Sequence, residues 1–267
     1  MKVQRRVVVV TGAGSGMGRE LTLELVRRGA KVAAVDMRAE TLAETVKLVA
    51  ALNGQVESFM LDVSDAAAVA ALPAKVKERL GDADILINNA GIIQKFVPIN
   101  DLSIEDAAHV MNVNFFGPLT LIKAFLPGLL TRPEAHILNV SSMGAYAPVP
   151  GQSVYGASKA AIKLLTEGLR SELLKTKVGV TVVFPGAIAT NIAANSGMGD
   201  ITLDSDSAKA MKTTSAPTAA RAMVDAIENN TPRITIGSDA KMMDRLSRLN
   251  PVMAANIIYK QMASLLK

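Results

Sequence analysis

The chain has 267 residues, a formal net charge of +5 and no cysteine. Without cysteine there is no disulfide, no thiolate metal ligand and no cysteine nucleophile, which fits a reducing compartment. The charge could favour nucleic acid, but the basic residues are scattered and only 3% of residues are aromatic, so we expect no nucleic-acid partner.

The length suits one α/β domain with a sizeable core, and we predict a single domain over residues 1–267. The two histidines, His109 and His136, lie in separate segments, so we expect neither a metal site nor a Ser-His triad. The apolar run at 7–10 is too short for a signal peptide. No stretch reaches the roughly eighteen consecutive apolar residues of a spanning helix, and we expect a cytoplasmic protein.

Residues 7–10 are all valine, the pattern of a strand buried on both faces of a parallel sheet. A glycine-rich loop follows, and the leucine-rich segment after it reads as a helix that stops at Gly29. Strand, glycine loop and helix N-terminus together favour a site for the pyrophosphate of a dinucleotide. The pattern is TGxxxGxG, and its predicted contacts are Gly12, Gly14, Ser15, Gly16, Met17 and Gly18.

The next predicted strand, 31–36, ends in Asp36, near the distance from the glycine loop at which an acid binds the adenosine ribose hydroxyls. A carboxylate there favours NAD, because it would repel a 2′-phosphate. Arg38 is the one nearby residue that could compensate, so NADP stays open. Asp36 could instead be an ordinary strand-end acid that opens a turn.

Two more strand-helix repeats follow, with strands at 56–61 and 85–87 and a helix that Asp65 caps. The repeats predict an α/β fold with a doubly wound, Rossmann-like parallel sheet. Because ligands bind beyond the carboxyl ends of such strands, Asp62 and the Asn88-Asn-Ala-Gly91 segment are expected at the same edge as the glycine loop.

A serine, a tyrosine and a lysine lie close together later in the chain. Tyr155 and Lys159 are four apart on a predicted helix, and Ser142 follows a predicted strand. A phenol has an ordinary pKa of about 10, and a cation about 4 Å away, at an effective dielectric of about 20, lowers it with an interaction of about 4 kcal/mol. Lys159 could thus tune Tyr155 for proton transfer, while Ser142 binds a carbonyl or hydroxyl. Alone, such a pair is more often just a helix face.

The motifs together resemble those of the short-chain dehydrogenase/reductase family. The shared elements are TGxxxGxG at 11–18, NNAG at 88–91, Asn114, Ser142, the Tyr155 and Lys159 pair, and Pro185-Gly186, in the family's order and spacing. The resemblance covers about residues 7–190. It implies NAD or NADP as cofactor, an alcohol or ketone as substrate, and assembly as a homodimer or homotetramer through helices near 115–126 and 155–174.

The resemblance also implies roles for single residues. Tyr155 would be the general acid/base, Lys159 would lower its pKa and hold the nicotinamide ribose, Ser142 would orient the substrate oxygen, and Asn114 would fix a water that links Lys159 to solvent. The remaining implied cofactor contacts are Asp62, Val63, Asn89, Ala90, Gly91, Pro185, Gly186, Ile188 and Thr190.

The second half should supply the substrate pocket. We interpret residues 191–215 as a lid that closes over the substrate, with a disordered insertion as the alternative. The predicted pocket is mostly apolar, which suggests a hydrophobic substrate, although some of its side chains could belong to the core. Its main residues are Gly144, Val149, Gln152 and Ala187.

The end of the chain, 239–267, reads as a helical tail interrupted at Pro251, with an apolar stripe among basic residues. We expect it to pack on its own or a neighbouring subunit, and a membrane-surface contact is the alternative.

The leading prediction is an NAD(P)-dependent alcohol dehydrogenase or carbonyl reductase. A dinucleotide-binding sensor or scaffold with little turnover is the alternative from another class, and an epimerase or dehydratase is a third.

Overall fold

The computed structural model describes residues 1–189, 192, 196 and 213–262. The predicted contact Thr190 and nearly all of the predicted lid lie outside these residues, as does the end of the predicted tail.

A seven-stranded sheet forms the centre of the molecule, and every neighbouring pair of its strands is parallel. The order is β3-β2-β1-β4-β5-β6-β9, so the chain winds outward from β1 in one direction and then returns to wind in the other. This is the predicted doubly wound arrangement. The strands are β1 (Val7–Thr11), β2 (Lys31–Asp36), β3 (Gln55–Met60), β4 (Ile85–Asn88), β5 (Ala135–Val140), β6 (Val178–Pro185) and β9 (Arg233–Ile236).

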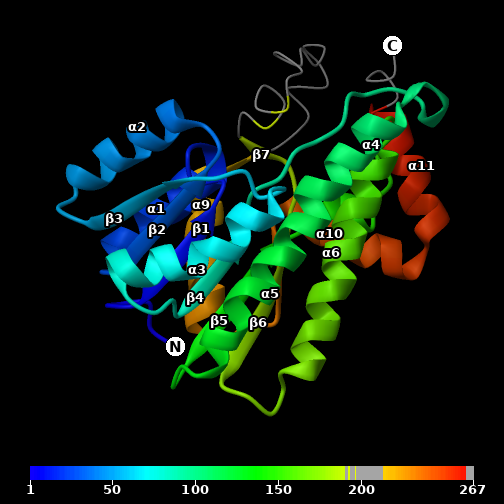
Figure 1. The fold of residues 1–267 in the computed structure, drawn as a ribbon. Coiled ribbons are helices and arrows are strands. Elements are labelled where there is room, and N and C mark those ends of the chain that lie inside the picture. The colour runs from blue at the N-terminus through cyan, green and yellow to red at the C-terminus, as the bar shows by residue number, and fades with distance from the viewer. Residues whose placement is uncertain (190–191, 193–195, 197–212, 263–267) are drawn as a thin grey trace.

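Helices cover both faces of the sheet (Figure 1). The apolar residues of α1, α2 and α9 pack with one face, and those of α3, α5 and α6 pack with the other. The helices are α1 (Gly16–Arg27), α2 (Ala39–Ala50), α3 (Ala66–Leu80), α4 (Ile104–Met111), α5 (Gly117–Leu130), α6 (Ser153–Glu172), α9 (Ala216–Glu228), α10 (Ser238–Leu249) and α11 (Pro251–Met262).

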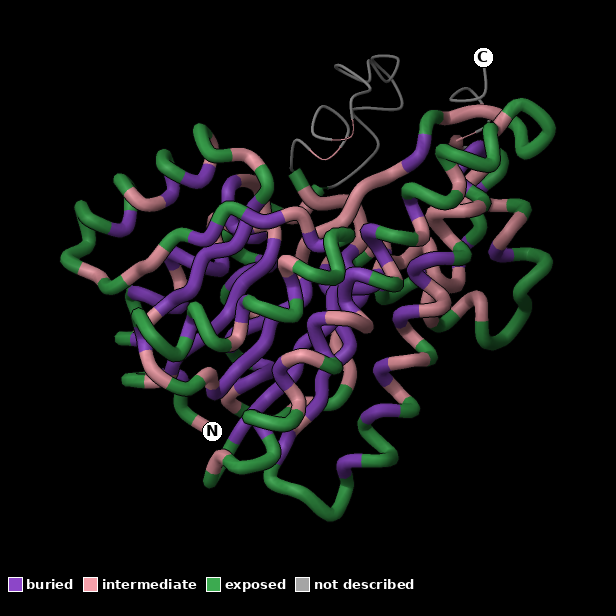
Figure 2. The backbone as a smooth tube through the Cα atoms, viewed as in Figure 1, coloured by how far each residue is buried: buried purple, intermediate pink, exposed green. Residues whose placement is uncertain are grey.

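The valine run of β1 explains why this strand is central. Val8 and Val10 belong to the cluster that includes α1 and α9, while Val7 and Val9 belong to the cluster on the opposite face. Successive side chains of a strand point to opposite faces, so a strand covered on both sides must be apolar throughout. Figure 2 shows the buried residues concentrated along the strands, with exposed residues on the outer helices.

Helices α4 and α5 are joined by a π-helical turn, Asn112–Phe116, into one run over Ile104–Leu130. Within the described chain, only this run is long and apolar enough, by length and composition, to cross a membrane, and 44% of its most apolar window is buried. Leu121 and Phe125 of α5 pack in the cluster with the sheet, as in the core helix of a globular domain. Polar residues interrupt the run, so the sequence shows no unbroken apolar stretch.

The tail is helical through Met262, as predicted. Pro251 does not kink one helix but begins α11, where its missing N–H costs nothing. Ala147, in the loop after β5, packs in one cluster with Met243 of α10 and with Ala254 and Ile258 of α11. The tail is therefore built onto the loop that carries Ser142.

A short parallel pair lies beside the exit of β6. It consists of β7 (Ile188–Ala189) and β8 (Thr214–Ser215), which bracket the residues outside the described part of the chain.

Candidate active site

The glycine loop after β1 forms a cradle at the N-terminus of α1. Gly12 has a φ of +68°, which favours glycine. A side chain at position 18 would collide with the Gly12 carbonyl, so the loop can fold this tightly only with glycine at 18. Ser15, Gly16 and Met17 line a cleft beside the cradle, and this cleft has a volume of about 380 Å³. The helix N-terminus offers unpaired N–H groups and a positive dipole end there, as a pyrophosphate requires.

Thr11 and Asn89 fasten the cradle to the end of β4. The Thr11 hydroxyl accepts hydrogen bonds from the backbone N–H groups of Asn89 and Ala90, both at 3.1 Å. The Asn89 side chain donates to the Thr11 carbonyl at 2.9 Å. Asn89, Ala90 and Gly91 all line the same cleft as the glycine loop, and their contact with a cofactor stays a prediction. The supporting role of Thr11 was missed, because it depends on which strand lies next to β1.

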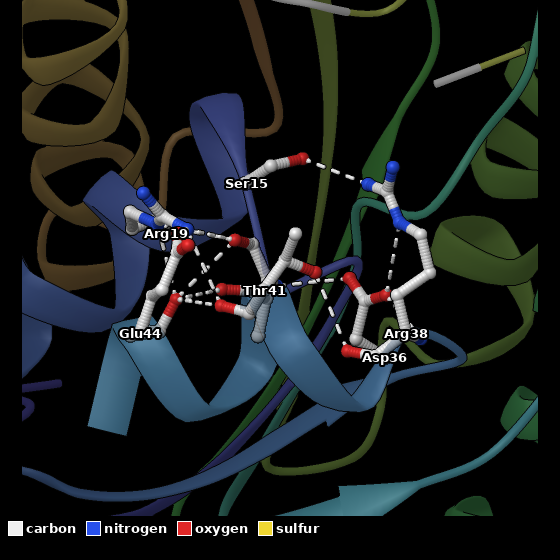
Figure 3. Close-up of polar contacts among 9 residues, drawn as sticks. Ser15, Arg19, Asp36, Arg38, Thr41 and Glu44 are labelled. Atoms are coloured by element: carbon white, nitrogen blue, oxygen red, sulfur yellow. Dashed lines mark hydrogen bonds and ion pairs between the residues drawn. The ribbon is translucent and has the colours of Figure 1, made fainter. Parts of the chain in front are cut away.

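Asp36 closes the other end of the cradle, at the end of β2 (Figure 3). Its Oδ2 accepts from the Gly14 N–H at 2.9 Å, and its Oδ1 accepts from the Arg38 N–H at 3.0 Å. The Arg38 guanidinium lies 3.9 Å from Asp36 and donates to the Ser15 hydroxyl at 3.3 Å. Asp36 thus holds the loop and also faces the cleft, and Arg38 lies beside it. Both predicted determinants of the NAD or NADP choice are at one place.

Asp62 and Val63 follow β3 and line the same cleft. Oδ1 of Asp62 accepts from the Ser64 N–H at 2.9 Å and from the Ser64 hydroxyl at 2.8 Å, which fixes the carboxylate. Val63 is buried in the core cluster with α3 and α5.

Ser142, Gly144 and Tyr155 meet where β5 ends. The Ser142 hydroxyl accepts from the Gly144 N–H at 3.0 Å, and it is close enough to the Tyr155 phenol to lower the pKa of that group. A Cβ at position 144 would lie 3.4 Å from the Tyr155 ring. The loop after β5 and the first turn of α6 therefore bring together the two hydroxyls that the sequence paired.

Lys159 lies one turn further along α6 and is buried. Its ammonium donates to the Val140 carbonyl at 3.1 Å and lies 5.8 Å from the centroid of the Tyr155 ring. A Cβ at Gly91 would lie 3.1 Å from both Lys159 Nζ and Asn114 Oδ1. Glycine at this position therefore leaves the space beside these two polar atoms open.

The protonation of the pair differs from the sequence expectation. Burial raises the pKa of Tyr155 above its ordinary 10, and the hydrogen bond from Ser142 only partly opposes this. Burial lowers the pKa of Lys159 to about 8. The sequence predicted a lowered Tyr155 pKa, whereas in the structure burial of the phenol raises it.

Asn114 lies in the π-helical turn and is fully enclosed. Its Oδ1 accepts from the Ile92 N–H at 2.9 Å, while its Nδ2 donates to the Ile92 carbonyl at 2.9 Å and to the Ser158 hydroxyl at 3.0 Å. π-Helical turns are frequent at functional sites. The Asn114 side chain clamps the strand-exit loop to α6, and its implied role toward a water stays a prediction.

The remaining predicted residues lie in different settings. Pro185 ends β6, Gly186 follows it and Ile188 begins β7. Ala187 donates its N–H to Asp239 at 2.6 Å. Val149 packs against the tail cluster and is thus part of a wall shared with the core. Gln152 is buried and donates to the Gln94 carbonyl at 2.6 Å, so its amide nitrogen faces a protein partner.

A doubly wound parallel sheet with a glycine cradle, a strand-end carboxylate and a Ser-Tyr-Lys cluster at one edge defines a Rossmann-type oxidoreductase. The family model described as short chain dehydrogenase matches residues 6–200. The chain belongs to the short-chain dehydrogenase/reductase family, as its motifs predicted.

Similar proteins agree with this assignment. A Mycobacterium tuberculosis protein named "Putative oxidoreductase SadH" is 37% identical over 250 residues, which cover 91% of this chain and 90% of that protein. A family member from Burkholderia phymatum, solved in complex with NAD, is 27% identical with a TM-score of 0.83, covering 94% of this chain and 98% of its own. One from Burkholderia cenocepacia, in complex with NADP, is 28% identical with a TM-score of 0.80, covering 97% and 99%.

Proposed function

We propose that the protein is an NAD(P)-dependent oxidoreductase that interconverts a hydrophobic secondary alcohol and its ketone, with Tyr155 as general acid/base. The observation that carries the proposal is that Ser142 and Tyr155 both lie beside Gly144, one helical turn from buried Lys159, where β5 ends.

The residues of the cleft fit a nicotinamide dinucleotide. The cradle of Gly12 and Gly18 leaves space for a pyrophosphate at the N-terminus of α1, and Asp36 lies where ribose hydroxyls would be bound. Asp62 and Val63 would flank the adenine, and Ile188 the nicotinamide. When bound, the cofactor supplies or accepts the hydride. Asp36 supports a preference for NAD, and Arg38 leaves some acceptance of NADP.

In ketone reduction, the Tyr155 hydroxyl would donate its proton to the carbonyl oxygen, while Ser142 donates a hydrogen bond to the same oxygen. The raised pKa of Tyr155 keeps the phenol protonated near neutral pH, which suits the acid role. In alcohol oxidation Tyr155 must first lose that proton, and the cationic form of Lys159 would stabilise the phenolate. The apolar cluster against which Val149 packs favours a hydrophobic substrate.

The decisive experiment compares wild type with Tyr155→Phe in an assay at 340 nm, with NADH and NADPH and a panel of ketones and alcohols. We expect turnover with NADH preferred and a loss of at least about a hundredfold in the variant, the usual scale of general acid–base catalysis. Cofactor binding, followed by calorimetry, should survive, because Phe keeps the ring. Undiminished activity of the variant would refute the role of Tyr155.

The alternative is a dinucleotide-binding sensor or scaffold. Tight cofactor binding with no turnover across the whole panel would support it over the enzyme. The presence of Ser142, Tyr155, Lys159 and Asn114 favours the enzyme, because a sensor has no need to keep all of them. We further propose that the enzyme works in the cytoplasm as a homodimer or homotetramer.

A further inference from the structure

Gln94 lies in the loop that leaves β4 and reaches α6, the helix that carries Tyr155. Its side chain is 3% exposed. The side-chain oxygen accepts from the backbone N–H groups of Val154 and Tyr155, both at 2.9 Å, and the side-chain nitrogen donates to the Gly151 carbonyl at 2.9 Å. The Gln94 amide therefore binds the first turn of α6 through its oxygen and the residue before the helix cap through its nitrogen, at separations of 57 to 61 residues.

These bonds meet a need of the helix itself. The first N–H groups of an α-helix have no intrahelical partner, and a residue at the helix start usually binds them. Gln152, the residue at that position in α6, makes no side-chain bond to the helix. Gln94 takes over this task from a different part of the chain.

Gln152 binds back to the loop. Its side-chain nitrogen donates to the Gln94 carbonyl at 2.6 Å, and the residue is 4% exposed. Its side-chain oxygen is buried and has no hydrogen-bond partner in the part of the chain that the structure describes. Gln94 and Gln152 thus fasten the loop to the helix from both sides. A buried oxygen without a partner costs free energy, so we infer that the position this pair gives to the helix is what keeps it in place.

The same short loop contacts two other parts of the site. Ile92 is held on both backbone groups by Asn114, and the Ile93 N–H donates to the Ser196 hydroxyl at 3.1 Å, between β7 and β8. Residues 92–94 therefore join Asn114, Ser196 and the start of α6. A shift of this loop would move the Tyr155 backbone directly.

We propose that Gln94 is a positioning residue that fixes Tyr155 relative to Ser142 and the cleft. The inference rests on the proposed role of Tyr155. Tyr155 is in the first turn of α6, the part of a helix that frays most readily, and its own N–H is one of the two groups that Gln94 binds. Misplacement of a reacting group by about 1 Å can cost about a hundredfold in rate, so a small relaxation of this turn is enough to matter.

The test uses two variants and a matched control in the full chain. Gln94→Met keeps the length and removes both bonds, whereas Gln94→Glu keeps an oxygen that accepts from both N–H groups. Gln55→Met, at the exposed start of β3, makes the same change away from the site. We expect Gln94→Met to lower kcat about tenfold to a hundredfold with the KM for NADH changed less than about twofold. We expect Gln94→Glu to regain much of that loss and Gln55→Met to match wild type.

A second readout separates positioning from mere stability. The pH dependence of kcat should change in Gln94→Met, because a displaced phenol loses its contact with Ser142, while melting temperatures report any loss of fold. Wild-type kcat and pH profile in Gln94→Met would overturn the inference, as would equal losses in Gln94→Met and Gln94→Glu. If Gln94→Met does not fold, Gln94→Glu alone decides: a folded Gln94→Glu with less than about a tenth of the wild-type kcat would also overturn the inference. Full activity of Tyr155→Phe would instead refute the proposed function.

Discussion

The backbone N–H of Ala187 donates a 2.6 Å hydrogen bond to the Asp239 carboxylate. Ala187 lies in the turn after β6, and Asp239 lies in the first turn of α10, so the helical tail supports this turn directly. The Gly186 N–H, one residue earlier, donates to the Ile236 carbonyl at 2.9 Å. In the proposed enzyme this turn lies beside the nicotinamide, which links the tail to cofactor binding.

We predict that Asp239→Ala raises the KM for the cofactor several-fold and lowers the free energy of unfolding by about 1.5–3 kcal/mol, the usual contribution of a hydrogen bond to a charged group. Steady-state kinetics and urea denaturation measure the two effects. Asp101→Ala, which removes an exposed acid, serves as the control. An unchanged KM in Asp239→Ala would contradict the link between tail and cofactor.

Catalysis should depend on pH in opposite ways for the two directions. The raised pKa of Tyr155 keeps the phenol protonated at neutral pH, as reduction needs, whereas oxidation needs the deprotonated form. We expect kcat/KM for oxidation to rise between pH 7 and pH 9 by at most about tenfold per pH unit, while that for reduction does not rise. Lys159, with a pKa near 8, loses its charge across this window and should flatten the upper part of the oxidation profile.

Initial rates in both directions, over buffers of constant ionic strength, check this prediction. Any residual oxidation by Tyr155→Phe should lack the rising limb. A reduction rate that rises with pH would indicate a different acid.

The outer faces of α5 and α6 predict self-association. Leu164 in α6 is 68% exposed, Leu174 just after α6 is 63% exposed, and Phe116 just before α5 is 51% exposed. A Cβ at Gly168 would meet nothing within 4 Å, so this face of α6 is open. We expect a dimer or tetramer by light scattering and a shift toward monomer in Leu164→Glu, because burying an unpaired carboxylate is costly. Glu172→Gln is the control, and a monomeric wild type would refute the prediction.

The sequence predicted those parts of the molecule that depend on local pattern. The valine run of β1, the cap of α3 by Asp65, the glycine cradle and the Tyr155 and Lys159 pair each follow from residues close in the chain. The bonds from Gln94 to α6 and from Asp239 to Ala187 join residues that are distant in the chain, and no spacing rule connects them. The direction of the Tyr155 pKa shift was missed for a related reason, since the burial that raises this pKa depends on tertiary packing.

His136 should make the protein sensitive to acid. Its Nε2 lies 2.8 Å from the Thr181 hydroxyl, and that hydroxyl donates to the Thr231 carbonyl, so Nε2 carries the proton of a neutral imidazole. Burial lowers the pKa of His136 from 6.5 to about 3. Between these values the unfolded chain binds the extra proton, and stability therefore falls as the pH drops below 6.5, by at most about 1.4 kcal/mol per pH unit.

Urea denaturation at pH 7, 6 and 5 should show this slope in wild type and a shallower one in His136→Gln. His109→Gln, which changes an exposed histidine, should keep the wild-type slope. Equal slopes in wild type and His136→Gln would assign the acid sensitivity to other groups.

The final prediction concerns the choice between NADH and NADPH. Asp36 accepts from Gly14 and Arg38 and repels a 2′-phosphate, while the Arg38 guanidinium lies 3.9 Å from it and close to Ser15. In Asp36→Ser the Arg38 guanidinium can turn to a 2′-phosphate. We therefore expect the ratio of kcat/KM for NADPH over that for NADH to rise about tenfold to a hundredfold, which corresponds to one charge-assisted hydrogen bond of about 1.5–3 kcal/mol. Adding Arg38→Met should abolish that gain, because it removes the only cation of this pair. Steady-state kinetics with both cofactors test the prediction. Melting temperatures report the stability lost when Gly14 no longer donates to Asp36. A ratio that does not rise in Asp36→Ser would show that Asp36 does not set the preference.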